Sequence, residues 1–110
     1  MYVTIRRYAA DPRYVGEIQR RVQEGFVPIV RSVRGFVSYE VVDGGGGVLA
    51  SISVFETKAG ADRAAELSQL WVQGNLARFF RGPPQVTAGE VAYHAVREPA
   101  ARERDLEPWG

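Results

Sequence analysis

Apolar and polar residues alternate along four segments of the chain. Residues 2–8, 36–42, 48–55 and 86–96 each place apolar side chains at every second position. This period of two is typical of a strand with two different faces, because successive side chains of a strand point to opposite sides. The sequence therefore predicts four strands.

A helical period of three and four separates the first two strands. Asp11 is the expected N-cap of this helix, and Pro12 falls in its first turn, where a missing N–H costs nothing. Pro28 predicts a kink or break, because it removes the hydrogen bond to the Glu24 carbonyl. Gly35 is the expected C-terminal glycine. The expected buried stripe comprises Val15, Ile18, Val22, Phe26, Ile29 and Val33.

A second helix is predicted from Thr57 to Phe80, between the third and fourth strands. Thr57 is a plausible N-cap, and Gly82 with the two following prolines ends the element. Trp71 and Asn75 are four residues apart and so share one side of this helix. Its expected buried stripe comprises Ala61, Ala65, Ser68, Val72, Leu76 and Phe79.

Four consecutive glycines, residues 44–47, join the second and third strands. A glycine-rich loop can cradle phosphate, but a phosphate loop leads directly into a helix N-terminus. The residues that follow, 48–52, have the pattern of a strand. A flexible hairpin loop is the better interpretation.

The predicted element order is β-α-β-β-α-β, which indicates an α+β, ferredoxin-like fold. Two right-handed strand–helix–strand units interleave into a four-stranded antiparallel sheet with both helices on one face. The other face is expected to be bare, and a homodimer whose sheets close face to face into an α+β barrel would cover it. The residues expected on the bare face are Thr4, Arg6, Tyr8, Phe36, Ser38, Ser51, Ser53 and Phe55.

Composition narrows the functional classes. The chain has 110 residues, a formal net charge of +1 and no cysteine, which excludes thiol catalysis and cysteine metal sites. The mixed charges predict no nucleic-acid partner. Neither a signal peptide nor a membrane span is expected, so a cytoplasmic location is the default. We expect one domain over residues 1–96 and a charged tail over 97–110, with Leu106 and Trp109 anchoring the tail on a partner subunit.

The segments 35–41 (GFVSYEV) and 51–56 (SISVFE), followed by the Trp71 helix, resemble the antibiotic biosynthesis monooxygenase domain of the dimeric α+β-barrel superfamily. The resemblance covers roughly residues 1–96. It implies oxidation of small aromatic, polyketide-like phenols or quinols by dioxygen, without flavin, metal or other cofactor. In such a reaction the deprotonated substrate is itself the reductant, so the protein binds, orients and stabilises an anion.

The resemblance also suggests roles for individual side chains. Trp71 would be a stacking wall, Asn75 a hydrogen-bond donor, and Arg6 the partner of an enolate or phenolate. Tyr39, Tyr93 and His94 could move protons. Strand alternation places Tyr39 and Tyr93 opposite to Arg6 and His94 within their strands, so these six side chains are not all expected in one cavity.

Each candidate also has a structural interpretation. Trp71 could be a core residue, and Asn75 could cap the helix or bind a loop. Arg6 could pair with Glu40 across the sheet. His94 could be satisfied by solvent or by the dimer interface.

Two alternatives compete with the oxygenase interpretation. Haem-degrading members of the superfamily need an axial histidine on the second helix or the loop after it, and residues 57–85 contain none. One histidine also falls short of an ordinary metal site. The alternative from a different class is a non-catalytic dimeric domain that binds a small molecule or a protein partner, since the same apolar pocket would serve it.

Overall fold

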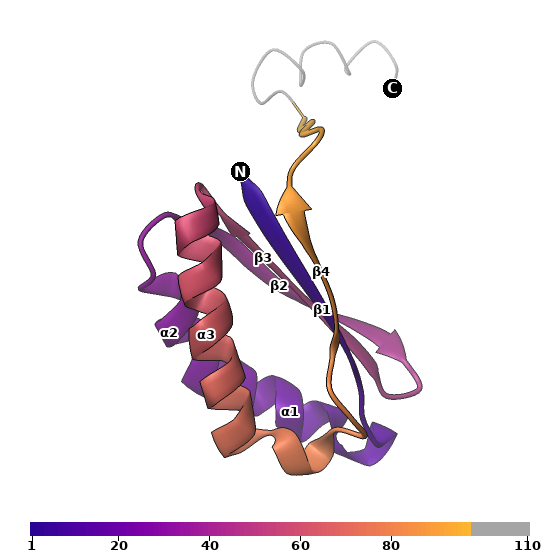
Figure 1. The fold of residues 1–110 in the computed structure, drawn as a ribbon. Coiled ribbons are helices and arrows are strands. Elements are labelled where there is room, and N and C mark those ends of the chain that lie inside the picture. Colours follow the sequence, from indigo (N-terminus) through magenta and orange to yellow (C-terminus); the bar gives the residue numbers. More distant parts are fainter. Residues whose placement is uncertain (98–110) are drawn as a thin grey trace, which may run out of the picture.

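The computed structural model describes residues 1–97. Four antiparallel strands form one sheet in the order β2-β3-β1-β4, and the helices cover one face of it (Figure 1). This confirms the predicted α+β, ferredoxin-like arrangement. The elements are β1 (Tyr2–Ala9), α1 (Val15–Arg21), α2 (Val27–Arg31), β2 (Phe36–Gly45), β3 (Val48–Phe55), α3 (Lys58–Asn75) and β4 (Gln85–Glu90).

The first helical region begins as predicted and then departs from a regular helix. The Asp11 side chain accepts a hydrogen bond from the Arg13 backbone N–H at 3.0 Å, and Pro12 opens a short 3-10 turn. Pro28 lies in the first turn of α2, and the regular α-helical pattern is interrupted before it while the backbone remains helical, so the chain does not break at Pro28 itself. A π-helical turn, Val22–Phe26, fills the space between α1 and α2.

The π turn changes which residues are buried. A π turn holds more residues than an α turn, so the buried positions Val22, Phe26 and Val30 follow at spacings of four. Val30 therefore takes the central place predicted for Ile29, which is half-buried. The helix also ends earlier than expected, at Arg31, and Gly35 instead adopts a φ of 85° in the turn that leads into β2.

The glycine run forms the hairpin between β2 and β3, as predicted. Gly45, Gly46 and Gly47 all have positive φ, a conformation in which a side chain is strained. Gly47 is also buried, and its carbonyl accepts a hydrogen bond from the Ala10 N–H at 2.8 Å. This glycine therefore anchors the hairpin to the end of β1.

The last strand is shorter than the predicted 86–96. Glu90 pairs with Tyr2, the first residue of β1, so the residues that follow β4 have almost no partner strand left. One further backbone bond joins the Val91 N–H to the Met1 carbonyl at 2.9 Å. The prediction that Tyr93 and His94 lie in a strand is therefore wrong.

The assignment of the bare sheet face is also corrected. Thr4 is 6 % exposed and Phe55 is 0 % exposed, because the helices cover their face of the sheet. Of the residues expected on the bare face, Ser38 does lie there, since it pairs with Val54 across a β-bulge. The helix-facing set is Thr4, Arg6, Tyr8, Phe36, Ser51, Ser53 and Phe55.

The opposite face, which we call the outer sheet face, carries Val3, Ile5, Ile52 and Val54 at its centre. No helix among residues 1–97 covers it (Figure 1). Alternation showed that the sheet has two faces, but only the packing of the helices decides which face is covered. Leu106 and Trp109 lie outside the described residues.

The core lies between the sheet and the helices. Its largest fully buried side chains are Phe55 of β3, Leu76 at the end of α3 and Val30 of α2. Thr57 caps α3 as predicted, with its hydroxyl accepting from the Gly60 N–H at 3.2 Å. No helix in the described part of the chain is both long enough and apolar enough to cross a membrane.

Candidate functional site

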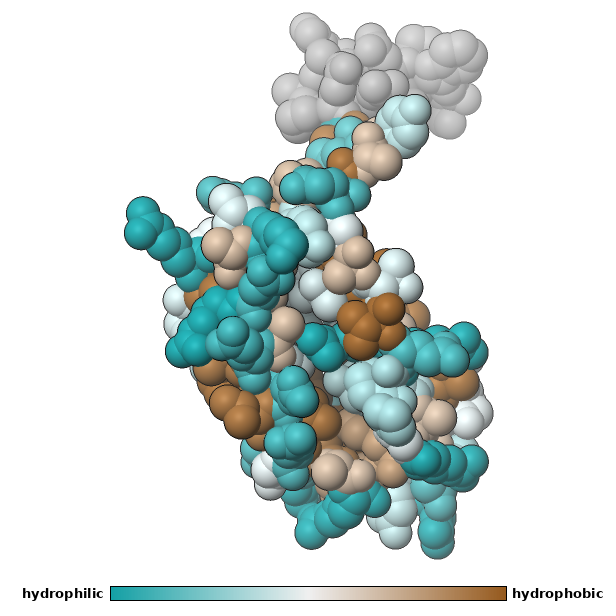
Figure 2. Space-filling view, in the orientation of Figure 1, coloured by the Kyte–Doolittle hydropathy of each residue, from teal (hydrophilic) through white to brown (hydrophobic). Residues whose placement is uncertain are grey.

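A groove of about 500 Å³ runs between α3 and the strands β1 and β4. In the space-filling view, the surface is hollowed between these elements (Figure 2). We call it the outer groove. Arg6 and Tyr8 come from β1, Gln69 and Gln73 from α3, and Phe80 from the segment that follows α3. Val72, Ala77, Gly82, Pro83, Pro84 and Val86 complete its lining.

A second space lies deeper between the sheet and the helices. This inner cavity has a volume of about 40 Å³. Its apolar walls come from α1, the π turn, β3 and α3, namely Ile18, Val22, Phe26, Leu49, Trp71 and Leu76. Tyr8, Val72 and Phe80 line both the inner cavity and the outer groove, so the two spaces are neighbours.

Tyr8 and Phe80 form an aromatic wall. Their rings are stacked, with centroids 4.4 Å apart and planes inclined by 24°. The geometry arises because Ala10 and Phe80 pair as an isolated bridge, which holds the segment after α3 against the end of β1. A planar ligand in the groove would therefore meet a ready-made aromatic surface.

Arg6 points to the helix-facing side of the sheet and lines the outer groove. The predicted pair with Glu40 does not form, because Arg6 aligns with Ser51 and Val41, whereas Glu40 aligns with Ile52 on the outer sheet face. Within residues 1–97, no carboxylate lies within ion-pair distance of Arg6. The groove thus contains a cation without a protein counter-charge in the described chain.

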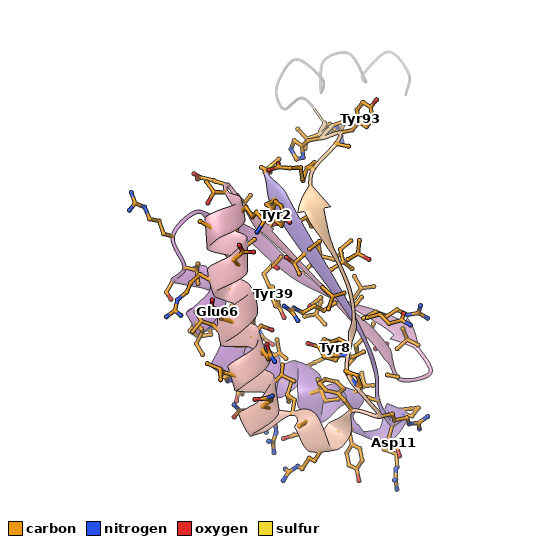
Figure 3. The ribbon with its side chains drawn as sticks, in the orientation of Figure 1. Tyr2, Tyr8, Asp11, Tyr39, Glu66 and Tyr93 are labelled. Carbon is orange, nitrogen blue, oxygen red and sulfur yellow. The ribbon has the colours of Figure 1, made fainter. Side chains whose placement is uncertain are left out.

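Tyr8 and Tyr39 lie on the same face of the sheet as Arg6, in the layer beneath α3 (Figure 3). The expectation that Tyr39 faces away from Arg6 is wrong, because the bulge between Phe36 and Ser38 shifts the alternation of β2 by one residue. Burial raises the pKa of Tyr39 to about 12, with a further contribution from Tyr8, while Ser51 and Arg6 act in the opposite direction.

Burial also raises the pKa of the Tyr8 hydroxyl, and Arg6 and Ser68 partly offset the increase. Both phenols are consequently held neutral at physiological pH. They are suited to donate a hydrogen bond to an anionic oxygen, and they are poor general bases.

Trp71 is half-buried and lines the inner cavity, where its ring lies 5.5 Å from that of Phe26. Both interpretations of this residue, core side chain and cavity wall, agree with this position. Its indole is accommodated by Gly25 in the π turn, because a β-carbon at Gly25 would lie 2.9 Å from Cζ2 of Trp71.

Asn75 lies outside the site that Trp71 lines. Its side chain is exposed, and Nδ2 donates to the Trp71 carbonyl at 2.8 Å. Its own backbone carbonyl accepts from Arg21 at 3.2 Å. These contacts correspond to the structural alternative, in which Asn75 closes the end of α3.

His94 and Tyr93 lie beyond β4, outside the sheet. Tyr93 is 95 % exposed and His94 is also exposed, so neither side chain reaches the groove or the cavity in this chain. Of the sequence candidates, the structure brings Arg6, Tyr39 and Trp71 together between the sheet and α3. It leaves Asn75, Tyr93 and His94 apart from them.

The sequence pattern did not single out Tyr8, Ser68, Gln69, Gln73 or Phe80 as site residues. Tyr8 follows Arg6 by two residues in the same strand and therefore lies on the same face. This spacing is the feature of the sequence that indicates Tyr8 as a site residue. Gln69 and Gln73 are four residues apart on α3, as expected of side chains on one helix face. Phe80 gave no comparable signal, because its place depends on the bridge to Ala10.

No three histidine, aspartate or glutamate side chains gather around a common point within residues 1–97. The described site therefore offers one guanidinium, two phenols, hydroxyls and amides, beside aromatic walls. Such a set can bind and orient a planar molecule that carries a negative charge.

No protein-family model and no curated protein matches the sequence significantly. Solved structures do match the fold. A monooxygenase from the gene ActVA-Orf6 of Streptomyces coelicolor, in complex with the ligand nanaomycin D, matches with a TM-score of 0.72 and 16 % identity, over 88 % of this chain and 92 % of that one.

Two further structures show the same architecture. NE2512 of Nitrosomonas europaea, a protein of unknown function, matches with a TM-score of 0.69 and 20 % identity, over 90 % of this chain and 94 % of that one. An antibiotic biosynthesis monooxygenase matches with a TM-score of 0.68 and 16 % identity, over 84 % of this chain and all of that one (100 %). At these identities the likeness establishes the fold, and the resemblance seen in the sequence is confirmed at that level: the chain folds as an antibiotic biosynthesis monooxygenase-like domain.

Proposed function

We propose that the protein is a cofactor-independent monooxygenase that oxidises a small aromatic phenol or quinol in the outer groove. The observation that carries the proposal is the Arg6 guanidinium, which faces a groove with an aromatic wall and has no counter-charge in the described chain. Its fold is shared with monooxygenase structures, one of which is in complex with nanaomycin D.

A half-buried arginine without a counter-charge in the described chain favours an anionic ligand. A guanidinium without a carboxylate partner loses hydration on burial. A charge-assisted hydrogen bond to a ligand compensates for this loss. A phenolate or enolate oxygen is such an acceptor. Binding by Arg6 would also lower the pKa of the bound phenol, because a nearby positive charge favours the ionised form.

The outer groove has the dimensions and walls of a small-molecule site. Its volume of about 500 Å³ lies within the range of roughly 300–1,000 Å³ that is usual for ligand pockets. Tyr8 and Phe80 offer a ring surface, and the prolines at positions 83 and 84 also line the groove. An aromatic substrate of one to three rings would stack there with its ionised oxygen towards Arg6.

In the proposed reaction the substrate anion reduces dioxygen directly. A C–O bond forms between the substrate carbon and dioxygen to give a peroxide, whose O–O bond then breaks. One oxygen atom stays on the substrate as a carbonyl and the other leaves as water, so a CH₂ group and O₂ give C=O and H₂O. The protein supplies binding, orientation and stabilisation of the anion by Arg6 and the neutral phenols.

We further propose that two copies associate through the outer sheet face. Val3, Ile5, Ile52 and Val54 lie at its centre, and no described helix covers them. A contiguous apolar patch of this kind is typical of an interface. A two-fold arrangement covers the face with a copy of itself and leaves both outer grooves on the far side of each sheet.

Oxygen uptake by purified protein, measured with a panel of phenols, quinols and anthrone-like compounds, tests the activity. We expect uptake above the uncatalysed rate with at least one class. Arg6→Gln should lower kcat/KM by about 100-fold or more, as removal of one anion-stabilising group does elsewhere. Arg34→Gln, at an exposed arginine outside the groove, is the matched control and should leave the rate unchanged.

A second candidate function is a binding domain without catalysis. The position of His94 favours it, because the only histidine of the chain is exposed and far from the groove. The raised pKa values of Tyr8 and Tyr39 also provide no base near neutral pH. Binding of panel compounds without oxygen uptake, detected by isothermal titration calorimetry, would establish this alternative.

A further inference from the structure

The inner cavity is too small for the substrate proposed above. Its volume is about 40 Å³, whereas a protein cavity that admits benzene measures about 150 Å³. By the same measure a cavity needs about 10–15 Å³ to hold one water molecule, so this cavity has room for two or three such atoms. A ligand of this cavity would therefore have two or three heavy atoms.

The lining favours an apolar occupant over water. Its walls are mainly aliphatic and aromatic side chains, and cavities lined in this way remain dry. The hydroxyls that reach the cavity already have polar neighbours: Tyr39 lies beside Ser51, and Tyr8 lies beside Ser68 and Arg6. A water molecule needs two to four partners, and these neighbours compete for them.

The cavity adjoins the outer groove. Tyr8, Val72 and Phe80 contribute to both linings, so the two spaces share part of one wall. A small molecule in the cavity would therefore lie close to a ring stacked on Tyr8 and Phe80.

We propose that the inner cavity is a binding site for dioxygen. Dioxygen is diatomic, uncharged and more soluble in apolar media than in water, which matches the size and lining of the cavity. The choice of dioxygen rests on the proposed oxidation, because that reaction consumes it. The cavity would hold dioxygen, the second substrate, beside the bound organic substrate.

Methyl relaxation in nuclear magnetic resonance spectra of the full chain, recorded under oxygen and under nitrogen pressure, tests the proposal. Dioxygen is paramagnetic and accelerates the relaxation of nearby methyl groups. We expect a several-fold larger enhancement at Val22, Leu49 and Leu76 than at Val33, which is buried but does not line the cavity. A uniform enhancement, or contacts between these methyls and a held water molecule, would overturn the proposal.

A cavity-filling variant provides a second readout. Val22→Ile adds one methyl group at the cavity wall, and Val33→Ile makes the same change at a position equally exposed at 9 % but outside the lining. Val22→Ile should remove most of the enhancement at Leu49 and Leu76, and Val33→Ile should preserve it. Retention of the enhancement in folded Val22→Ile would contradict the assignment.

The same pair of variants separates the cavity from the proposed function. If a panel compound is oxidised, Val22→Ile should raise the KM for dioxygen several-fold and leave the KM for the organic substrate unchanged. An unchanged KM for dioxygen would contradict the proposal that the inner cavity supplies dioxygen to the reaction. Localised relaxation enhancement in a protein that oxidises nothing would retain the dioxygen site and reject the oxygenase.

Discussion

A β-carbon on Gly25 would stand 2.9 Å from Cζ2 of Trp71. The π turn of the first helical region therefore leaves a gap that the indole of α3 fills. Trp71 in turn packs against Phe26, the last residue of that turn, at a ring distance of 5.5 Å. This contact fixes one wall of the inner cavity, because Phe26 and Trp71 both line it.

Gly25→Ala should destabilise the protein. The added methyl displaces the indole, an overpacking cost of about 1–3 kcal/mol, against a helix-propensity gain of about 1 kcal/mol. We expect a net loss on the order of 1 kcal/mol in urea unfolding. Gly16→Ala, where nothing lies within 4 Å of the new methyl, should instead stabilise. In a Trp71→Phe background, Gly25→Ala should lower the free energy of unfolding by less than it does in the parent. The same decrease in both backgrounds would contradict the contact between Gly25 and Trp71.

Gly47→Ala should be the more damaging glycine substitution. Its φ is 88°, and a β-carbon would lie 1.9 Å from the Ala10 carbonyl oxygen, which belongs to the backbone and cannot rotate away. Left-handed strain alone costs about 1–2 kcal/mol, and the clash adds to it. Thermal unfolding should show a large fall in Tm. Gly46 has a φ of 62° and open space around it, so Gly46→Asn should lower Tm only slightly. Equal falls in Tm for the two variants would contradict the contact between Gly47 and Ala10.

Glu17 should stabilise the protein only above strongly acidic pH. Hydrogen bonds from Arg20 and Arg21 lower the pKa of Glu17 from 4.5 to about 2. Because the folded pKa lies below the unfolded one, the stabilisation is present above pH 4.5 and disappears as the pH falls to about 2. Urea unfolding of Glu17→Gln should thus differ from the parent at pH 7 and converge with it near pH 2. Glu56→Gln, at an exposed carboxylate without an ion pair among residues 1–97, is the control, and a difference that persists at pH 2 would refute the ion pair.

Tyr39 should make the folded state sensitive to alkali. Burial raises its pKa to about 12, above the ordinary value of 10.0, so the folded state holds this proton more tightly than the unfolded state. Stability is therefore present below pH 10 and falls as the pH rises towards 12. An absorbance titration of phenolate should show a late component that Tyr39→Phe reduces. Tyr93→Phe, at a ring 95 % exposed, should leave this component in place.

Ile52→Glu should separate the proposed dimer. The residue lies at the centre of the outer sheet face, opposite Ile5, and a carboxylate buried there by association without a partner charge would cost several kcal/mol. The dissociation constant should rise by at least about 100-fold, measured by sedimentation velocity. Leu70→Glu, on α3 and 67 % exposed, should leave association unchanged. A monomeric parent protein would refute the interface.

The order of strands and helices follows from the sequence alone. Local signals suffice for this, since Thr57 and Asp11 cap helices through bonds within a few residues, and the glycines of 44–47 permit a turn. The period of the apolar residues separated strands from helices and identified most of the buried helix positions. These features depend on neighbours along the chain, so they can be predicted from it.

Alternation assigned Arg6 and Tyr8 to one face, but the covered face was predicted to be the other one. The β-bulge at the start of β2 reversed the expected side of Tyr39. A shift of one residue moves every following side chain to the opposite face, and its position depends on cross-strand pairing.

The contacts of Trp71, Asn75 and His94 likewise depended on partners distant in sequence. The indole occupies a gap at Gly25, which arises from the π turn, and Arg21 holds the end of α3 where Asn75 lies. His94 is outside the sheet because β1 begins at Tyr2, which pairs with Glu90, and offers no further pairing partner. The local pattern thus defined the elements, whereas packing between elements decided which side chains meet in the groove and the cavity.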